Sequence, residues 1–197
     1  MVPLKALLDN YGIKRIVYST YQAVSGAGMQ GIKDLEDGLK GLEPKKFPYP
    51  IAGNCLPHID VFLENGYTKE EIKMIEETKK ILHSNDLKIT ATTVRVPVLN
   101  SHSESINVEL NSQFELEDIF KLFEQTEGLT VFDNIDKLKY PTALDVSGKD
   151  DVYVGRIRRD FSLDNGLNLW VVADNIRKGA ALNAIQIAEV LIKNEWL

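Results

Sequence analysis

Two kinds of hydrophobic pattern alternate along the chain. Runs rich in β-branched and aromatic residues predict strands, and these lie at 16–21, 88–98, 105–110, 152–157 and 167–173. Apolar residues spaced three or four apart predict helices, at 2–8, 29–39, 69–82, 116–123 and 180–192. Because strands and helices mix without a strict strand–helix–strand rhythm, we predict an α+β fold. We expect one compact unit over residues 1–197, with a mixed, largely antiparallel sheet covered by helices.

Local signals define the ends of some of these elements. Thr68 and Glu71 form a capping-box pattern that predicts the start of the helix at residue 69. The Asp-Asn-Gly sequence at 164–166 predicts a hairpin between the last two strands. The helix at 180–192 is apolar on most sides, which predicts that it is buried between layers of the fold or between chains.

The composition argues against several classes of partner. A net charge of -6 predicts a field that repels phosphate backbones and anionic lipid, so we expect neither nucleic acid nor a membrane as partner. No apolar stretch approaches the roughly 20 residues that a bilayer requires, and the first residues lack a signal-peptide pattern. A cytoplasmic location is expected. The single cysteine, Cys55, cannot form an internal disulfide or a multi-thiolate site, so no metal is expected.

A polar, glycine-bearing loop follows the first strand. Glycines such as Gly26 allow a ligand to approach the backbone closely, and Gln22 and Ser25 offer hydrogen-bond donors and acceptors. The loop is either a ligand-binding loop or a bare turn. The residues alone favour the turn.

An arginine and a histidine stand seven positions apart around the next pair of strands. Arg95 closes a β-branched run, where a buried guanidinium requires a carboxylate from the protein or from a substrate. His102 stands just ahead of the following strand. It is either a general acid or base or a hydrogen-bonded structural residue. His58 and His83 lack comparable neighbours and are interpreted as structural or surface residues.

Two other groups favour structural interpretations. The helix at 69–82 carries two glutamates and two lysines that could present charges to a ligand, but a solvated charged face is favoured; they are Glu76, Glu77, Lys79 and Lys80. Cys55, in a proline-bounded apolar stretch, is expected to be a small packing residue rather than a nucleophile.

Four segments in this order resemble the aspartate-semialdehyde dehydrogenase family over essentially the whole chain. They are STYQAVSGAG at 19–28, EETKKIL at 76–82, RVPVLNSHSESINVE at 95–109 and ADNIRKGAALNAIQIAEVL at 173–191. The resemblance implies the C-terminal, substrate-binding and dimer-forming domain of such an enzyme, with a fold like that of the C-terminal domain of glyceraldehyde-3-phosphate dehydrogenase.

The resemblance also implies roles for individual residues. Arg95 would bind the substrate α-carboxylate and His102 would be the acid and base. Gln22 would orient the acyl intermediate, Glu77 would contact the substrate amino group, and Lys80 would help to bind phosphate. Two neighbours serve as alternatives for the last two roles, Glu76 and Lys79. Three residues would lie against the nicotinamide end of NADP: Ser25, Gly26 and Asn175.

The implied reaction converts L-4-aspartyl phosphate to L-aspartate 4-semialdehyde with NADP, an early step toward lysine, threonine and methionine. The nucleophilic cysteine and the domain that mainly binds NADP would lie in an N-terminal region absent here, so we expect a homodimer that is inactive alone. Two alternatives stay open: an enzyme like N-acetyl-glutamyl-phosphate reductase, and a non-catalytic dimerisation module.

Overall fold

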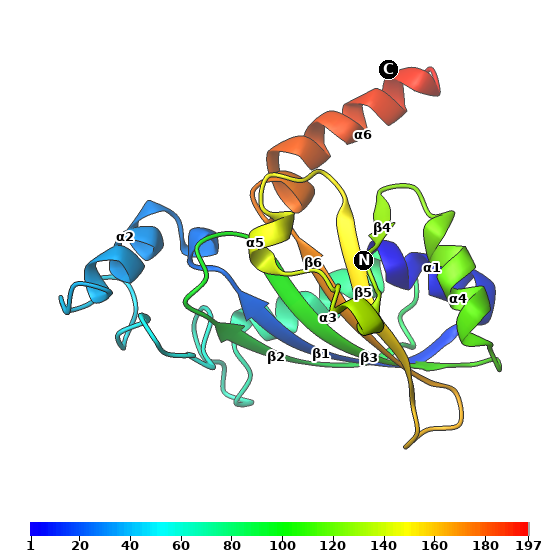
Figure 1. Cartoon of the computed structure of the whole chain (residues 1–197), viewed down its shortest axis with the longest axis horizontal. Coiled ribbons are helices and arrows are strands. Elements are labelled where there is room, and N and C mark those ends of the chain that lie inside the picture. Colours follow the sequence, from blue (N-terminus) through cyan, green and yellow to red (C-terminus); the bar gives the residue numbers. More distant parts are fainter. Residues whose placement is uncertain (197) are drawn as a thin grey trace.

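A single six-stranded sheet forms the centre of the computed structural model, which describes residues 1–196 (Figure 1). The strands are β1 (Ile13–Gln22), β2 (Lys88–Arg95), β3 (His102–Leu110), β4 (Leu129–Val131), β5 (Val152–Asp160) and β6 (Gly166–Ala173). They lie in the order β2-β1-β3-β6-β5-β4. The pairs β1–β3, β3–β6 and β5–β6 are antiparallel, whereas β1–β2 and β4–β5 are parallel. The predicted α+β fold with a mixed, largely antiparallel sheet is confirmed.

Helices surround this sheet. They are α1 (Val2–Tyr11), α2 (Met29–Gly38), α3 (Lys69–Ile81), α4 (Leu116–Glu124), α5 (Ala143–Val146) and α6 (Leu182–Lys193), with short helical turns at Val24–Ala27, Ile135–Lys137 and Arg177–Ala181. The capping box at the start of α3 is present, because Thr68 and Glu71 each accept the other's backbone N–H. The sequence patterns missed β4 and α5, because elements this short do not show a period.

Strand boundaries differ from the predicted ones. β1 begins at Ile13 rather than at residue 16, and β3 begins at His102 rather than at residue 105. β3 is longer because β1 and β6 pair with it on both sides, so its backbone is hydrogen-bonded whatever its side chains are. His102 is therefore the first residue of a strand and not part of the connection before it.

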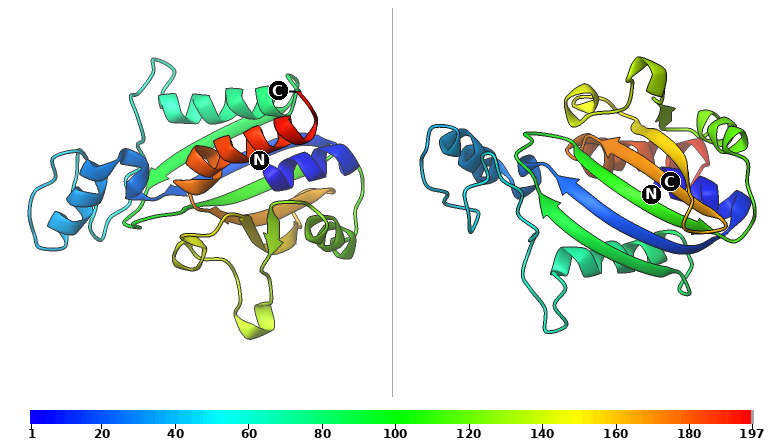
Figure 2. Two further views of the ribbon diagram at one scale, coloured as in Figure 1. Left: turned by 90° about the horizontal axis from the view of Figure 1, so that it is seen from above. Right: turned by 60° about the horizontal axis from the view of Figure 1, so that its bottom comes forward.

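The two faces of the sheet have different surroundings. On one face, α1, α3 and α4 contribute to the main hydrophobic core, in which Leu4, Ile16 and Phe123 are fully buried. On the other face, none of the helices of residues 1–196 covers β1, β2 and β3, as the right view of Figure 2 shows. We call these the covered face and the open face. Because side chains alternate along a strand, buried Gln22 and exposed Tyr21 belong to different faces.

An excursion of the chain between β1 and α3 extends from one end of the sheet (Figure 1). It encloses a second small core made of Val24, Leu35, Ile51 and Leu56. Asp34 on α2 is buried, and it accepts hydrogen bonds from the backbone N–H groups of residues 45, 46 and 47. Burial alone raises the pKa of this carboxyl, but those hydrogen bonds outweigh burial and lower it. Asp34 thereby holds the proline-bearing loop against α2.

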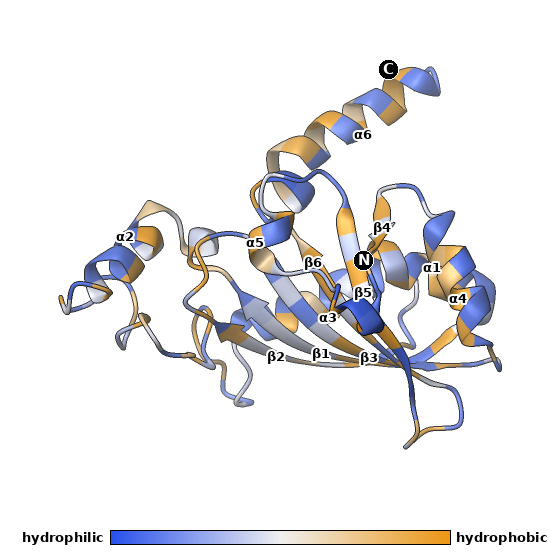
Figure 3. Cartoon of the chain, in the orientation of Figure 1, coloured by the Kyte–Doolittle hydropathy of each residue, from blue (hydrophilic) through white to orange (hydrophobic). Residues whose placement is uncertain are grey.

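Helix α6 is not buried within the chain. It points away from the sheet (Figure 1), and none of its residues is buried. Apolar positions are spread around it (Figure 3), and Ile185, Ile187, Val190 and Ile192 are all more than half exposed. The prediction of burial between layers of this chain is wrong, because only the preceding helical turn packs extensively against α6. No helix in the described part of the chain is long and apolar enough to span a bilayer.

Candidate active site

Four strands bring their ends together at one edge of the sheet. β1 and β2 run parallel and end at Gln22 and Arg95, which are register partners. β3 is antiparallel to β1 and starts at the same edge with His102, opposite Ala173, the last residue of β6. β1 lies between β2 and β3. Arg95 and His102 therefore approach one another across the end of β1.

Arg95 is a buried cation without an ion-pair partner. Its side chain is 5% exposed, Nη1 donates to the carbonyl oxygen of Ala23 at 2.6 Å, and Nε has no hydrogen-bond partner. None of the ion pairs within residues 1–196 includes Arg95. Desolvation lowers the pKa of the guanidinium, and the nearby Glu70 carboxylate opposes the change. A buried guanidinium with free N–H groups is suited to bind a carboxylate from outside the chain.

His102 is held by the backbone of the same residue, Ala23. The backbone N–H of Ala23 donates to its Nδ1 at 3.2 Å. Desolvation, followed by the charges of Arg95 and Lys73, lowers the pKa of the imidazole to about 4, although Asp174 raises it. The ring is therefore neutral near pH 7. With Nδ1 accepting a hydrogen bond, its proton lies on Nε2.

Gly26 lies against both of these side chains. A Cβ atom at this position would lie 3.0 Å from Nη1 of Arg95 and 3.1 Å from Nε2 of His102. These separations are tighter than ordinary van der Waals contact, so any larger residue would fill the space between the two groups. The loop predicted as either a ligand loop or a bare turn thus borders both Arg95 and His102.

Helix α3 brings a carboxylate and an ammonium to the same end of the sheet. Gln22 Nε2 donates to Glu70 Oε1 at 3.3 Å, and Glu70 forms an ion pair of 3.3 Å with Lys73. The neighbouring Glu71 fixes the start of the helix on the sheet, because its Oε1 accepts the backbone N–H of Thr93 in β2 at 3.0 Å. The capping box thus determines which turn of α3 lies beside Arg95.

The structure corrects the residues of α3 that were expected at the site. Glu77 lies two turns beyond Glu70, about 10 Å along the helix axis at 1.5 Å per residue, and lines a separate small cavity that includes Tyr18 and Glu104. Lys80 is exposed. The alternative residues, Glu76 and Lys79, are not at the site either, because they form an exposed ion pair of 3.3 Å with each other. Glutamate–lysine pairs three apart recur along α3, so spacing alone did not identify the right turn.

The residues expected near a nicotinamide lie together at the same edge. Asn175 Nδ2 donates to Ser25 Oγ at 3.1 Å, and Ser25 Oγ also donates to Oδ1 of Asn100 at 3.1 Å. Ser25 adjoins Gly26 in the sequence. The structure therefore gathers Ser25 and Gly26, from the loop after β1, and Asn175, from the segment after β6, beside Arg95 and His102.

Comparison with known proteins identifies the family. Residues 4–178 match the family described as semialdehyde dehydrogenase, dimerisation domain. The chain belongs to this family. An aspartate-semialdehyde dehydrogenase of Aquifex aeolicus is 52% identical over an alignment 200 residues long that covers 98% of this chain and 59% of that protein. One of Bacillus subtilis is 45% identical over an alignment of 204 residues that covers 96% of this chain and 59% of that protein.

Solved structures give the same result for the dimerisation domain. The crystal structure of aspartate semialdehyde dehydrogenase II from Vibrio cholerae complexed with ASA matches with a TM-score of 0.92 and 47% identity, covering 98% of this chain and 58% of that one. The enzyme with NADP from Candida albicans matches with a TM-score of 0.72 and 28% identity, covering 99% and 55%. The chain spans about three fifths of the length of the curated relatives it matches.

Cys55 lies outside the pocket of this semialdehyde dehydrogenase domain. Its side chain is exposed, so the expectation that it is a packing residue is wrong. His58 does not face it but stacks on Phe62, with ring centroids 4.4 Å apart, and His83 is exposed. Among residues 1–196, no group of three or more histidine, cysteine, aspartate or glutamate side chains is arranged to hold a metal ion.

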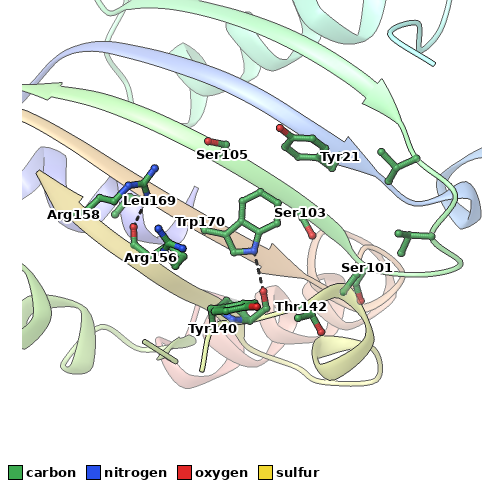
Figure 4. Close-up of a pocket in the computed structure, with 14 residues that line it drawn as sticks. Tyr21, Ser101, Ser103, Ser105, Tyr140, Thr142, Arg156, Arg158, Leu169 and Trp170 are labelled. Atoms are coloured by element: carbon green, nitrogen blue, oxygen red, sulfur yellow. Dashed lines mark hydrogen bonds between the residues drawn. The ribbon is translucent and has the colours of Figure 1, made fainter. Parts of the chain in front are cut away.

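The dimerisation domain has a second feature that the sequence analysis missed. A cavity of about 560 Å³ lies on the open face (Figure 4), and neither Gln22 nor Arg95 lines it. Tyr21 and Trp170 line it with ring centroids 5.5 Å apart, and Trp170 Nε1 donates to the Pro141 carbonyl at 2.9 Å. The one available signal was the alternation of a strand, which places Tyr21 opposite to Gln22.

Proposed function

We propose that this chain is the C-terminal, substrate-binding part of an NADP-dependent aspartate-semialdehyde dehydrogenase. One observation carries the proposal: a buried guanidinium without a carboxylate partner faces a neutral imidazole across a glycine. The reaction would be the reversible conversion of L-4-aspartyl phosphate to L-aspartate 4-semialdehyde, in the cytoplasm and toward lysine, threonine and methionine. The family and the relatives' names support this reaction.

Each charged group of the substrate would meet an opposite charge. Arg95 would bind the α-carboxylate through two parallel N–H donors, which a fixed guanidinium fork provides. Glu70 would accept the α-ammonium, and Lys73 would pair with the phosphate. Glu70 and Lys73 replace Glu77 and Lys80 in these roles because they lie beside Gln22 and Arg95. Gln22 would orient the acyl group from the end of β1.

His102 would carry the proton. The charges of Arg95 and Lys73 depress the pKa of the imidazole, and a bound carboxylate and phosphate would neutralise both charges. Binding should therefore raise this pKa toward the neutral range that an acid–base catalyst requires. In the neutral ring, the Nε2–H would donate a hydrogen bond to the substrate oxygen that becomes negative during the reaction.

NADP would lie against the loop after β1. Ser25, Gly26 and Asn175 lie together with polar groups at the pocket edge, and Gly26 has no side chain to occupy the space. When bound, the cofactor supplies the hydride in its reduced form, NADPH, and as NADP⁺ accepts it in the reverse direction. Most of its contacts, and the cysteine nucleophile, would belong to the part of the relatives that this chain does not span.

We propose that the open face forms a homodimer. The description of the family as a dimerisation domain supports this assembly, and the aromatic side chains of Tyr21, Tyr140 and Trp170 line a cavity there. Aromatic residues are enriched at protein interfaces, where they bury large areas. An isologous dimer would pair this face with its own copy.

Calorimetric titration of the chain with a non-hydrolysable phosphonate analogue of L-4-aspartyl phosphate tests the proposed function. Heat of binding is expected, and the N-acetylated analogue should bind at least about 10-fold more weakly because it lacks the ammonium that Glu70 would accept. Preference for the N-acetylated compound would favour a reductase like that of N-acetyl-glutamyl phosphate. Binding of neither compound by a dimeric chain would favour a non-catalytic dimerisation module.

A further inference from the structure

The two residues that follow β6 connect several loops at the active-site edge. Ala173, the last residue of β6, pairs with His102, and the chain then turns away from the sheet. Asp174 is 2% exposed and Asn175 is half-buried. Both side chains form hydrogen bonds with the loop between β2 and β3 that leads into His102.

The carboxylate of Asp174 is saturated with donors from three segments. Its Oδ2 accepts hydrogen bonds from Asn100 Nδ2 at 2.9 Å and from the backbone N–H of Gly148 at 2.7 Å. Its Oδ1 accepts the backbone N–H groups of Ile176 at 2.9 Å and Arg177 at 3.2 Å. Burial alone raises the pKa of this carboxyl, but these hydrogen bonds outweigh burial and lower it. All four partners are donors, so the group is required as an acceptor in its ionised form.

Asn175 holds the residue directly before His102. Its Oδ1 accepts the backbone N–H of Ser101 at 2.9 Å. Ser101 is fully buried with φ of 72°, a left-handed conformation that is unfavourable for a residue with a side chain. A strained, buried residue persists only when its surroundings determine it, and Asn175 supplies one such contact.

We propose that Asp174 is a positioning residue for His102, acting through Asn100 and Asn175. Its four hydrogen bonds hold the ends of two loops so that Ser101 keeps its left-handed conformation. That conformation directs the imidazole so that Nδ1 meets the Ala23 N–H and Nε2 reaches the pocket beside Gly26. The inference rests on the proposed function for its catalytic meaning, but the geometry that it predicts can be measured without substrate.

Nitrogen-15 NMR of the imidazoles in the full chain tests this inference. The chain has three histidines, and a His102→Gln variant assigns the signal of interest. In the wild type, the shifts should show a neutral ring with the proton on Nε2. In Asp174→Asn, an NH₂ group replaces one acceptor oxygen, so we expect mixed tautomers for His102 and about 10-fold weaker binding of the phosphonate analogue.

Asp160→Asn is the matched control. The Asp160 carboxylate also accepts several hydrogen bonds, from Asn107 and Ser162, and its pKa is likewise lowered by them. It pairs with Gly166 at the opposite end of β6. Asp160→Asn should lower the melting temperature without changing the His102 shifts.

Unchanged His102 shifts in Asp174→Asn, with only a lower melting temperature, would overturn the inference. If Asp174→Asn does not fold, Asn175→Ala decides in the same way, because it removes the acceptor for the Ser101 N–H, together with the hydrogen bond to Ser25. The charged groups that act on His102 are Arg95 and Lys73, which lower its pKa, and Asp174, which raises it. Altered shifts in a chain whose wild type binds no analogue would support the positioning role while contradicting the proposed function.

Discussion

The two faces of the sheet differ in the side chains that they present: buried polar groups on one and accessible aromatic groups on the other. At the edge of the covered face, Arg95 is buried without an ion-pair partner and His102 is kept neutral. On the open face, Tyr21 and Trp170 leave aromatic surface around a cavity. Polar groups that recognise a small charged ligand gain from removal of water, whereas a surface for a second protein must remain accessible. One strand can contribute to both kinds of surface, because its side chains alternate between the faces: Tyr21 lies on the open face and the adjacent Gln22 on the covered face.

Ser105→Glu, on the open face, should have the largest effect, by weakening the proposed dimer. Ser105 lines the open-face cavity and pairs in register with Trp170. In an isologous dimer the change buries one carboxylate per copy at about 2 kcal/mol each, which weakens dimerisation on the order of 1000-fold. Sedimentation measures the dimer dissociation constant. Ser162→Glu, on the exposed β5–β6 turn, should leave it unchanged. Dimers of undiminished strength in Ser105→Glu would place the interface elsewhere.

Lowering the pH should destabilise the covered face. The pKa of His102 is about 4 in the folded chain and about 6.5 when unfolded, so the unfolded imidazole binds a proton first as the pH falls. The free energy of unfolding should drop between pH 6.5 and 4 by up to about 3 kcal/mol from this group, and not further below pH 4. The difference between urea-unfolding curves of wild type and His102→Gln isolates this contribution.

Three carboxyl groups lose their contribution to stability at a lower pH than His102, so they do not obscure the change between about pH 6.5 and pH 4. The carboxyls of Asp34, Asp160 and Asp174 have lowered pKa values, so the stability they contribute is lost only below their unfolded value, about pH 4. A constant difference between wild type and His102→Gln from pH 7 to pH 4 would contradict the burial of a neutral imidazole.

Arg95→Met should remove ligand binding while leaving assembly intact. Loss of the guanidinium removes the bidentate contact to the substrate carboxylate, so the phosphonate analogue should bind about 100-fold more weakly by calorimetry. Stability should change little, since replacing a buried charge by an apolar side chain of similar length is often neutral. Arg158→Met on the open face is the control and should keep wild-type ligand affinity. Equal losses in both variants would argue against a carboxylate site at Arg95.

Glu71→Gln should have the smallest of these effects, confined to the covered face. The change replaces one of the acceptor oxygens that hold Thr68 and Thr93, which should cost about 1–2 kcal/mol in urea unfolding. Because α3 carries Glu70 and Lys73, binding of the analogue should weaken while dimerisation persists. Glu76→Gln on the exposed side of α3 should cost less than about 0.5 kcal/mol. Equal costs in the two variants would show that Glu71 does not anchor the helix.

The sequence by itself determined the elements and the most unusual residues of this protein. Local periods predicted the five longest strands and five of the helices, and the Thr68 capping box was read directly from four residues, because capping depends only on neighbours in the chain. Arg95 was identified as needing a partner because a cation in a β-branched run is costly wherever the strand lies.

Only the tertiary structure decided which side chains meet. Arg95 and His102 are seven positions apart in the sequence but lie on strands separated by β1, so their convergence depends on the sheet order. Glu70 rather than Glu77 reaches the site because Glu71 binds the backbone of β2, a contact 22 positions away. The open face and the exposure of α6 likewise follow from what packs nearby. A local pattern records the preferences of a segment, whereas long-range contacts determine which of several equivalent turns or faces is used.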